Sequence, residues 1–82
     1  MNRAIVYGRP GCVRCRQTER KFAKFGVTVI SECIDDFPDK QAEMEKNNEF
    51  ELPLVELELN GENYRWTGLR DKNFEAVKEL LK

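Results

Sequence analysis

The sequence has no histidine, only three cysteines and no long hydrophobic run among its 82 residues. A structural zinc site usually takes four cysteine or histidine ligands, so these residue types alone cannot complete one here. A membrane-spanning helix needs about 20 consecutive apolar residues, and no stretch of the chain comes near that length. The apolar residues before Gly8 are also too few for the core of a signal peptide. These absences therefore argue against a metal-stabilised fold, a membrane span and a secretion signal.

The composition that remains is typical of one small soluble domain. With 40% hydrophobic and 35% charged residues, residues 1–82 can form a single core and no second domain. We predict a cytoplasmic location, and a monomer is the default for a chain of this size. The cytoplasm keeps thiols reduced, which favours a working dithiol over a stabilising disulfide.

The formal net charge of −1 hides an uneven distribution along the chain. The first 24 residues carry seven Lys or Arg against one acidic residue, whereas the remainder is acidic. For Arg9 and Arg14, which flank the cysteines, we favour a role in stabilising a thiolate and attracting an acidic partner. For Arg20, Lys21 and Lys24, a solvated helix face is the better interpretation. Nucleic acid is not an expected partner, because the net charge is negative and no basic stripe alternates with aromatic residues.

The stretch from Tyr7 to Cys15 carries the strongest functional signal. It has the pattern of an apolar strand end, a Gly/Pro turn and a Cys-x-x-C pair at the start of a helix. At a helix N-terminus, Cys12 meets free backbone N–H groups and the positive end of the helix dipole, which lower the pKa of a thiol. Cys15 lies one turn further along on nearly the same face, where its thiol can attack a mixed disulfide at Cys12. The pair is therefore predicted to cycle between dithiol and disulfide.

Two other uses of this cysteine spacing are weaker. Cys-x-x-C can form half of a zinc site, but Cys33 is the only further cysteine. A structural disulfide between residues so close in sequence would restrict the unfolded chain little. Cys33 itself falls on a predicted strand away from the Gly/Pro turn. We interpret it as a small buried hydrophobic residue in preference to a regulatory thiol.

Hydrophobic periodicity in the first half of the chain predicts strand, helix and strand. Residues 4–7 form a short continuous apolar run, as expected for a central parallel strand covered on both faces. A helix follows from residue 13 and stops at Gly26, and residues 27–34 are β-branched and apolar like a second strand. The inward face of the helix is predicted to comprise Thr18, Phe22 and Phe25. This order implies a right-handed parallel crossover.

A second, weakly amphipathic helix is predicted after residue 34. Either aspartate of Asp35-Asp36 can serve as its N-cap, and Pro38 fits its first turn. The helix is expected to run to about Asn47-Asn48. Its inward-facing residues are predicted to be Gln41, Met44 and either Phe37 or Ala42.

The last third of the sequence predicts a hairpin and a helix. Residues 54–59 alternate between apolar and acidic, which is typical of a half-exposed strand. Asn60-Gly61 favours a type I′ turn that leads back through residues 62–66 as an antiparallel partner. Asp71 is expected to cap a final helix that ends at Lys82. The predicted fold is α/β with the element order βαβαββα, a four-stranded mixed sheet flanked by three helices.

Together these elements resemble the thioredoxin fold in its small glutaredoxin form, and the chain most closely resembles the NrdH-redoxin family. The stretches that carry the resemblance are 7–15 with Thr18 beyond it, 52–55 and 66–71. It covers essentially the whole chain, and it implies that Cys12 is the nucleophile and Cys15 the resolving thiol. It also implies a cis-proline at Pro53 beside the dithiol, with the backbone of Leu52 offered to a bound partner strand. Without the resemblance, a trans proline at the start of a strand would be the preferred interpretation.

Members of this family take electrons from thioredoxin reductase and pass them to class Ib ribonucleotide reductase. The resemblance therefore implies these partners or another disulfide-bearing protein. No bound cofactor is expected beyond the redox-active disulfide of Cys12 and Cys15. The expected partner-binding residues are Arg9, Val13, Arg14, Leu52, Pro53, Trp66, Thr67 and Gly68.

Glutathione-using glutaredoxins resemble one another in a Gly-Gly pair whose backbone N–H groups hold the tripeptide's carboxylate. Trp66 and Thr67 replace that pair in this chain. Trp66 is either a lid that packs against the first helix and narrows the glutathione groove, or a core aromatic at a strand end. A glutathione-dependent glutaredoxin remains an alternative, because Arg9 and Arg70 can still supply positive charge. A second alternative is a non-enzymatic thioredoxin-fold module that docks a partner or holds a [2Fe–2S] cluster.

Three positions depart from the family pattern. Arg14 stands where the family commonly has Gln, and Arg9 where it commonly has Lys. Glu51 places a negative charge just before Leu52 and the expected cis-proline.

Overall fold

The chain folds into four strands and three α-helices, which the computed structural model describes over residues 2–82. In chain order the elements are β1 (Arg3–Gly8), α1 (Val13–Lys24), β2 (Thr28–Cys33), α2 (Pro38–Lys46), β3 (Leu54–Leu59), β4 (Glu62–Thr67) and α3 (Asp71–Leu80). A short 3₁₀ turn, η1 (Ile34–Asp36), joins β2 to α2. The predicted βαβαββα order is confirmed.

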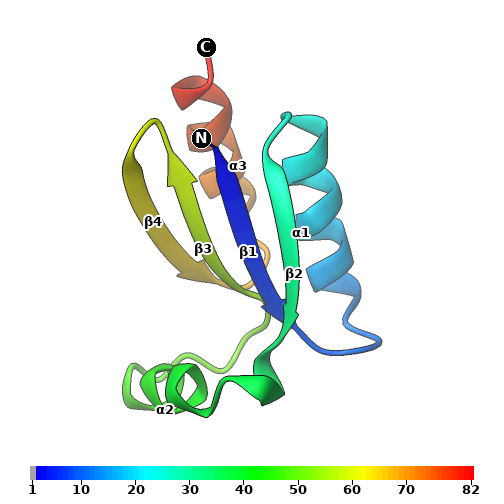
Figure 1. The fold of residues 1–82 in the computed structure, drawn as a ribbon, viewed down its shortest axis with the longest axis vertical. Coiled ribbons are helices and arrows are strands. Elements are labelled where there is room, and N and C mark those ends of the chain that lie inside the picture. The colour runs from blue at the N-terminus through cyan, green and yellow to red at the C-terminus, as the bar shows by residue number, and fades with distance from the viewer. Residues whose placement is uncertain (1) are drawn as a thin grey trace.

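β1 lies inside the sheet, whose strand order is β2-β1-β3-β4 (Figure 1). It runs parallel to β2, with the crossover through α1, and antiparallel to β3. β3 and β4 form a hairpin whose turn residues Asn60 and Gly61 have φ values of 52° and 84°. Positive φ at both central residues is what a type I′ turn requires. The sheet is therefore mixed, and the segment from β1 to α1 leaves it at the same end that α2 crosses (Figure 1).

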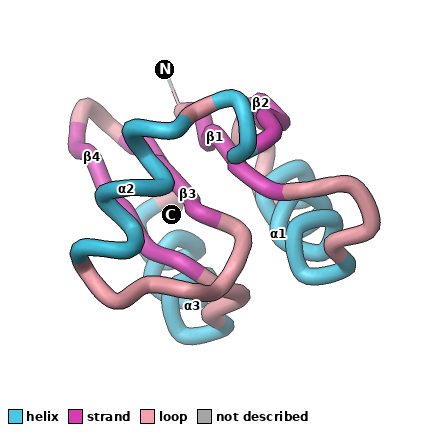
Figure 2. Tube along the Cα trace, turned by 90° about the horizontal axis from the view of Figure 1, so that it is seen from below, coloured by secondary structure: helices cyan, strands magenta, loops and turns pink. Residues whose placement is uncertain are grey.

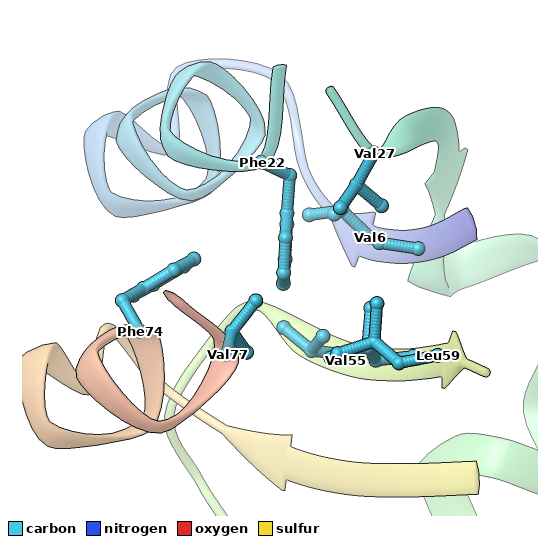
Figure 3. Packing of buried hydrophobic residues seen from close by; sticks show 9 residues of the cluster. Val6, Phe22, Val27, Val55, Leu59, Phe74 and Val77 are labelled. Carbon is cyan, nitrogen blue, oxygen red and sulfur yellow. The ribbon is translucent and has the colours of Figure 1, made fainter. Parts of the chain in front are cut away.

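The main core fills the space between one face of the sheet and helices α1 and α3 (Figure 3). Phe22 points from α1 into this space, and its ring centroid lies 4.9 Å from that of Phe74 on α3. The strands supply alternate residues, because successive side chains of a strand point to opposite faces. The buried members are Ala4, Val6, Phe22, Val27, Val55, Leu57, Leu59, Phe74 and Val77. Burying each large apolar side chain contributes about 1.5–3 kcal/mol, so this cluster holds both helices on the sheet.

α2 lies on the other side of the sheet from α1 and α3 (Figure 2). A smaller apolar cluster attaches it there. Its buried members are Tyr7, Ile34, Met44 and Leu54. Of the two candidates for the inward face of α2, Phe37 packs against this cluster and Ala42 is exposed. The ring of Phe37 meets that of Tyr7 edge-on at 5.0 Å between centroids. Gln41 is half-buried and donates from Nε2 to the Ile34 carbonyl at 2.9 Å.

A polar network ties α2 to the same side of the sheet. The Tyr7 hydroxyl donates to Glu56 Oε1 at 3.0 Å, and Lys40 Nζ donates to Glu56 Oε2 at 2.6 Å. Lys40 Nζ also lies 5.0 Å from the centroid of the Tyr7 ring. Burial, followed by the neighbouring Glu56 carboxylate, raises the pKa of Tyr7 above its ordinary value. The hydrogen bond to Glu56 raises the pKa of Lys40.

Two predicted helix caps are wrong. The N-cap of α2 is Phe37, because the two preceding aspartates lie in η1. The N-cap of α3 is Arg70, which places Asp71 one position inside the helix, and α3 ends at Leu80 short of the predicted Lys82. Neither N-cap side chain accepts a hydrogen bond from its helix. Asp71 still interacts favourably with the helix dipole, since acidic residues in a first turn do so.

Candidate active site

The Cys-x-x-C pair sits where the segment after β1 turns into α1. Cys12 is the N-cap residue of α1, and its amide donates to the Arg9 carbonyl at 3.1 Å to close the turn. The two cysteines form a disulfide with their Cα atoms 5.3 Å apart. The Cys15 amide donates to Cys12 Sγ at 3.2 Å. Cys12 is half-buried, whereas Cys15 is fully buried, so only the first sulfur is open to a partner.

The buried sulfur of Cys15 is packed against the end of β1. A Cβ atom added at Gly8 would lie 2.5 Å from Cys15 Sγ, well inside ordinary contact distance. One turn further along α1, the buried hydroxyl of Thr18 donates to the Arg14 carbonyl at 2.8 Å. Gly8 and Thr18 therefore fix the position of the second sulfur and of the helix turn that carries it.

Pro53 immediately precedes β3, and its bond to Leu52 is cis. The residue that follows it, Leu54, pairs with Tyr7, so the proline adjoins the end of β1 from which the Cys-x-x-C segment departs. The Pro53 carbonyl accepts a hydrogen bond from the Gly68 amide at 2.8 Å. The predicted cis-proline is confirmed, and Leu52, Pro53 and Gly68 come together at this end of the sheet.

Trp66 packs into the main core from the edge strand β4. Its ring centroid lies 6.0 Å from those of Phe22 on α1 and Phe74 on α3. The ring is partly buried, and its Nε1 has no hydrogen-bond partner within residues 2–82. Trp66 thus contacts α1, as a lid requires, and belongs to the core as well. Thr67, which follows it, is buried.

The charged residues near the site are mostly paired. Arg9 binds Asp35 through Nε and Nη2, both at 3.0 Å from Oδ1. Glu51, which departs from the family pattern, pairs with Arg70 at 3.0 Å. Arg14 is exposed, as is Val13, which is 68% accessible at the first position of α1. Of the two arginines expected to act on the thiolate, Arg9 is therefore engaged by a carboxylate.

Cys33 lies on a strand, at the end of β2, as predicted, but it is not the buried residue that was expected. It is half-buried, and its thiol donates to Asp35 Oδ2 at 3.8 Å. It is also not remote from the Gly/Pro turn, because it pairs with Gly8 across the parallel strands. Cys33 is only half-buried because β2 is an edge strand, and no further strand covers its outer side.

The segment between α2 and Pro53 contains residues that sequence reasoning missed. Phe50 is 76% exposed on this loop. Glu49, beside it, is held by Arg65 of β4 with Oε1 to Nη2 at 2.8 Å and Oε2 to Nη1 at 3.0 Å. The hydrogen bond from Arg65 lowers the pKa of Glu49. The sequence did hold a signal for Phe50: a phenylalanine stands among polar residues in a loop, outside both the helix before it and the strand after it.

Residues 2–82 offer neither a cluster of metal ligands nor a membrane-spanning helix. No group of three or more His, Cys, Asp or Glu side chains there could hold a metal ion. No helix of that range is long and apolar enough to cross a membrane.

Comparison with known proteins identifies the family. The glutaredoxin family model matches residues 4–57. No curated protein sequence matches the chain. The structure is similar to NrdH-redoxin from Escherichia coli, with a TM-score of 0.70 and 24% identity over 92% of this chain and 93% of that one. It is also similar to a glutaredoxin from Archaeoglobus fulgidus, with a TM-score of 0.56 and 22% identity over 100% and 88%.

A further structural neighbour is the thioredoxin of Fasciola hepatica, with a TM-score of 0.59 and 14% identity over 99% of this chain and 81% of that one. These likenesses show the thioredoxin-like fold. The family match, over residues 4–57, includes most of β1, the Cys-x-x-C pair and the cis-proline. The chain therefore belongs to the glutaredoxin family and is a thiol–disulfide oxidoreductase.

Proposed function

We propose that the protein is a cytoplasmic electron carrier that is reduced by thioredoxin reductase and in turn reduces a protein disulfide, that of class Ib ribonucleotide reductase in the first place. The observation that carries the proposal is the surface around Cys12. Cys12 is half-buried at the helix N-terminus and is followed by exposed Val13. The cis-proline adjoins the end of β1 that leads to Cys12, and Trp66 packs against α1 from the end of β4. Such a surface suits a protein partner better than a small peptide.

In the proposed reaction, the Cys12 thiolate attacks one sulfur of the partner's disulfide. A mixed disulfide forms, and the partner's other sulfur leaves as a thiolate. The Cys15 thiol loses its proton to solvent and attacks Cys12 Sγ, which forms the Cys12–Cys15 disulfide and releases the second partner thiolate. Two electrons have then passed to the partner. The dithiol of the reductase restores the carrier by the same steps in reverse.

The first sulfur is suited to nucleophilic attack by its position. As the N-cap residue of α1, Cys12 faces the backbone N–H groups of the first helical turn, and one of them already donates to its sulfur. No acidic residue lies in that turn to oppose a negative charge. The positive end of the helix dipole therefore stabilises a thiolate there. Cys15, fully buried behind it, is suited to the resolving role.

Two observations favour thioredoxin reductase over glutathione as the electron donor. Trp66 and Thr67 occupy the position of the Gly-Gly pair that glutathione-using relatives share, and Trp66 is packed against both α1 and α3. The NrdH-redoxin of Escherichia coli, to which the structure is similar, has a thioredoxin-like activity profile although it is a glutaredoxin-like protein.

A donor assay tests this proposal. NADPH with thioredoxin reductase is compared with NADPH, glutathione and glutathione reductase, each with the same protein disulfide as acceptor. We expect fast turnover with the first system and slow turnover with the second. Trp66→Gly should raise the glutathione rate, whereas Tyr64→Gly, an equivalent change at an exposed position of β4, should not. Rapid reduction by millimolar glutathione together with no reduction by thioredoxin reductase would establish the glutaredoxin alternative.

A further inference from the structure

The loop between α2 and Pro53 exposes an aromatic ring beside the active site. Phe50 is 76% exposed, more than Val13 or any other large hydrophobic residue within 2–82. Single exposed apolar residues are common on protein surfaces, so exposure alone says little. What distinguishes Phe50 is the way in which its neighbours are held.

Ion pairs anchor the loop on both sides of Phe50. Glu49 makes the two hydrogen bonds to Arg65 described above, and Arg65 Nε lies 3.2 Å from Glu43 Oε1 on α2. On the other side, Glu51 pairs with Arg70, whose Nε donates to the Thr67 carbonyl at 3.0 Å. Paired bonds between an arginine and a carboxylate fix orientation as well as distance. The ring of Phe50 is therefore exposed on a loop that ion pairs hold to β4, through Arg65, and to the segment that follows β4, through Arg70.

The backbone between these anchors is unpaired. Within residues 2–82, the N–H and C=O groups of Phe50, Glu51 and Leu52 make no hydrogen bond to another backbone group. An extended segment of another protein can pair with such groups, as in β-strand addition. The segment is thus held in place by side chains and leaves its backbone available.

A groove runs from Phe50 to the Cys-x-x-C segment. It has a volume of about 140 Å³, and Arg9, Ile34, Met44, Phe50 and Leu52 are among the residues that line it. Arg9 belongs to the turn that ends at Cys12, so the groove borders the segment that leads to the first cysteine. Its lining has an apolar part, made by Ile34, Met44, Phe50 and Leu52, and a polar part of similar size, made by Arg9, Gln41, Glu45 and Glu49.

We propose that Phe50 is a specificity-determining residue, which binds an apolar side chain next to the cysteine in an extended segment of the disulfide-bearing partner protein. Glu49 and Arg65 are positioning residues that hold the ring at the mouth of the groove. The inference deepens the proposed function and rests on exchange between this protein and protein disulfides. It does not depend on which reductase supplies the electrons.

The test uses two short synthetic peptides that differ only in having Leu or Ser next to a single cysteine. The cysteine is linked by a disulfide to 2-nitro-5-thiobenzoate. The Cys12 thiolate of the reduced protein attacks the peptide sulfur, and the coloured thiolate leaves, so its absorbance reports the rate. We expect the wild-type protein to react about ten times faster with the Leu peptide than with the Ser peptide, since burying one such side chain is worth about a factor of ten.

Phe50→Ser should abolish this preference, while its rate with free 5,5′-dithiobis(2-nitrobenzoate) stays within about twofold of wild type, since that small disulfide cannot reach the groove. Leu80→Ser, which removes an exposed apolar residue at the end of α3, should keep the preference. The proposal is overturned if wild type shows no preference, if the preference survives Phe50→Ser, or if the small disulfide slows equally.

The positioning role has its own readout. Arg65→Met should reduce the Leu-to-Ser rate ratio several-fold without changing the rate with the small disulfide, and Arg65→Lys should restore part of the ratio, because lysine keeps the charge but not the two parallel bonds. An unchanged ratio in Arg65→Met would refute that role. If thioredoxin reductase fails to reduce the wild-type protein, the proposed electron donor is wrong, and the peptide comparison still decides the role of Phe50.

Discussion

Replacing Gly8 by alanine should change both the stability of the protein and the reduction potential of its disulfide. Gly8 does not have a positive φ, so the backbone accepts any residue there, and the constraint is space. The new Cβ would lie 2.5 Å from Cys15 Sγ and 2.9 Å from Cys15 Cβ. Ordinary contacts between heavy atoms are about 3.5–4.0 Å, so Cys15 must move by roughly 1 Å. Cys15 is fully buried, which leaves it little room to do so.

Overpacking of this kind costs about 1–3 kcal/mol. We expect the cost to be larger in the oxidised form, because the bond to Cys12 prevents the Cys15 sulfur from rotating away, whereas the free thiol can turn. A difference of about 1.4 kcal/mol between the two forms corresponds to about 30 mV for a two-electron couple. Because the oxidised form is the one destabilised, the potential should shift to a less negative value.

The assay is denaturant unfolding of the oxidised and reduced proteins, together with equilibration of the disulfide against a dithiothreitol redox buffer. Gly8→Ala is also measured in a Cys15→Ala background, where the clash with Sγ is removed and the cost should fall. Gly11→Ala is the matched control. Gly11 has a φ of 81°, and apart from its two chain neighbours nothing lies within 4 Å of an added Cβ, so the cost of this change should be independent of Cys15. Equal costs of Gly8→Ala in both redox forms and both backgrounds would refute the reasoning.

Two further predictions follow from the surroundings of the sheet. Lys40→Met should destabilise the protein by about 0.5–1 kcal/mol near pH 7, a discounted value because Lys40 and Glu56 are partly exposed. The pKa of Lys40 is raised on folding, so its contribution is present below the lysine's ordinary pKa and disappears as pH rises through the higher folded value. Wild type should thus lose more stability than Lys40→Met in urea unfolding between about pH 7 and pH 11, and parallel curves would contradict the assignment. Cys33→Ser should retain full disulfide-reducing activity and lose less than about 1 kcal/mol, because the site is half-buried and Asp35 can accept from the serine hydroxyl; loss of activity in the folded variant would give Cys33 a role in the reaction.

The sequence was sufficient to predict the fold because each element has a local signal. The apolar run before Gly8 and the spacing of Thr18 and Phe22 are periodic patterns, and Asn60-Gly61 specifies its own turn. The Cys-x-x-C pair could be placed at a helix start for the same reason. The cis bond at Pro53 was predicted from the family resemblance, since a strand-start proline is locally just as compatible with trans.

The features that could not be predicted depend on contacts between distant residues. The pair of Glu49 and Arg65 joins residues 16 apart in sequence, and charged surface residues carry no periodic signal. Cys33 lies on an apolar strand, and composition alone did not show that this strand is at the sheet edge. The cap of α2 was misplaced because a 3₁₀ turn takes up the two aspartates, which a helix-entry signature does not distinguish.

The central claim is that Cys12 is the attacking sulfur of a working dithiol, and alkylation mapping tests it most directly. The fully reduced protein is treated briefly with iodoacetamide at mildly acidic pH, and the adduct is located by mass spectrometry. At the N-terminus of α1 the thiolate of Cys12 is stabilised and accessible, while Cys15 is buried. We predict that Cys12 is labelled first and that disulfide-reducing activity is lost in proportion. Preferential labelling of Cys15 or Cys33, or full activity after Cys12 is labelled, would contradict the account.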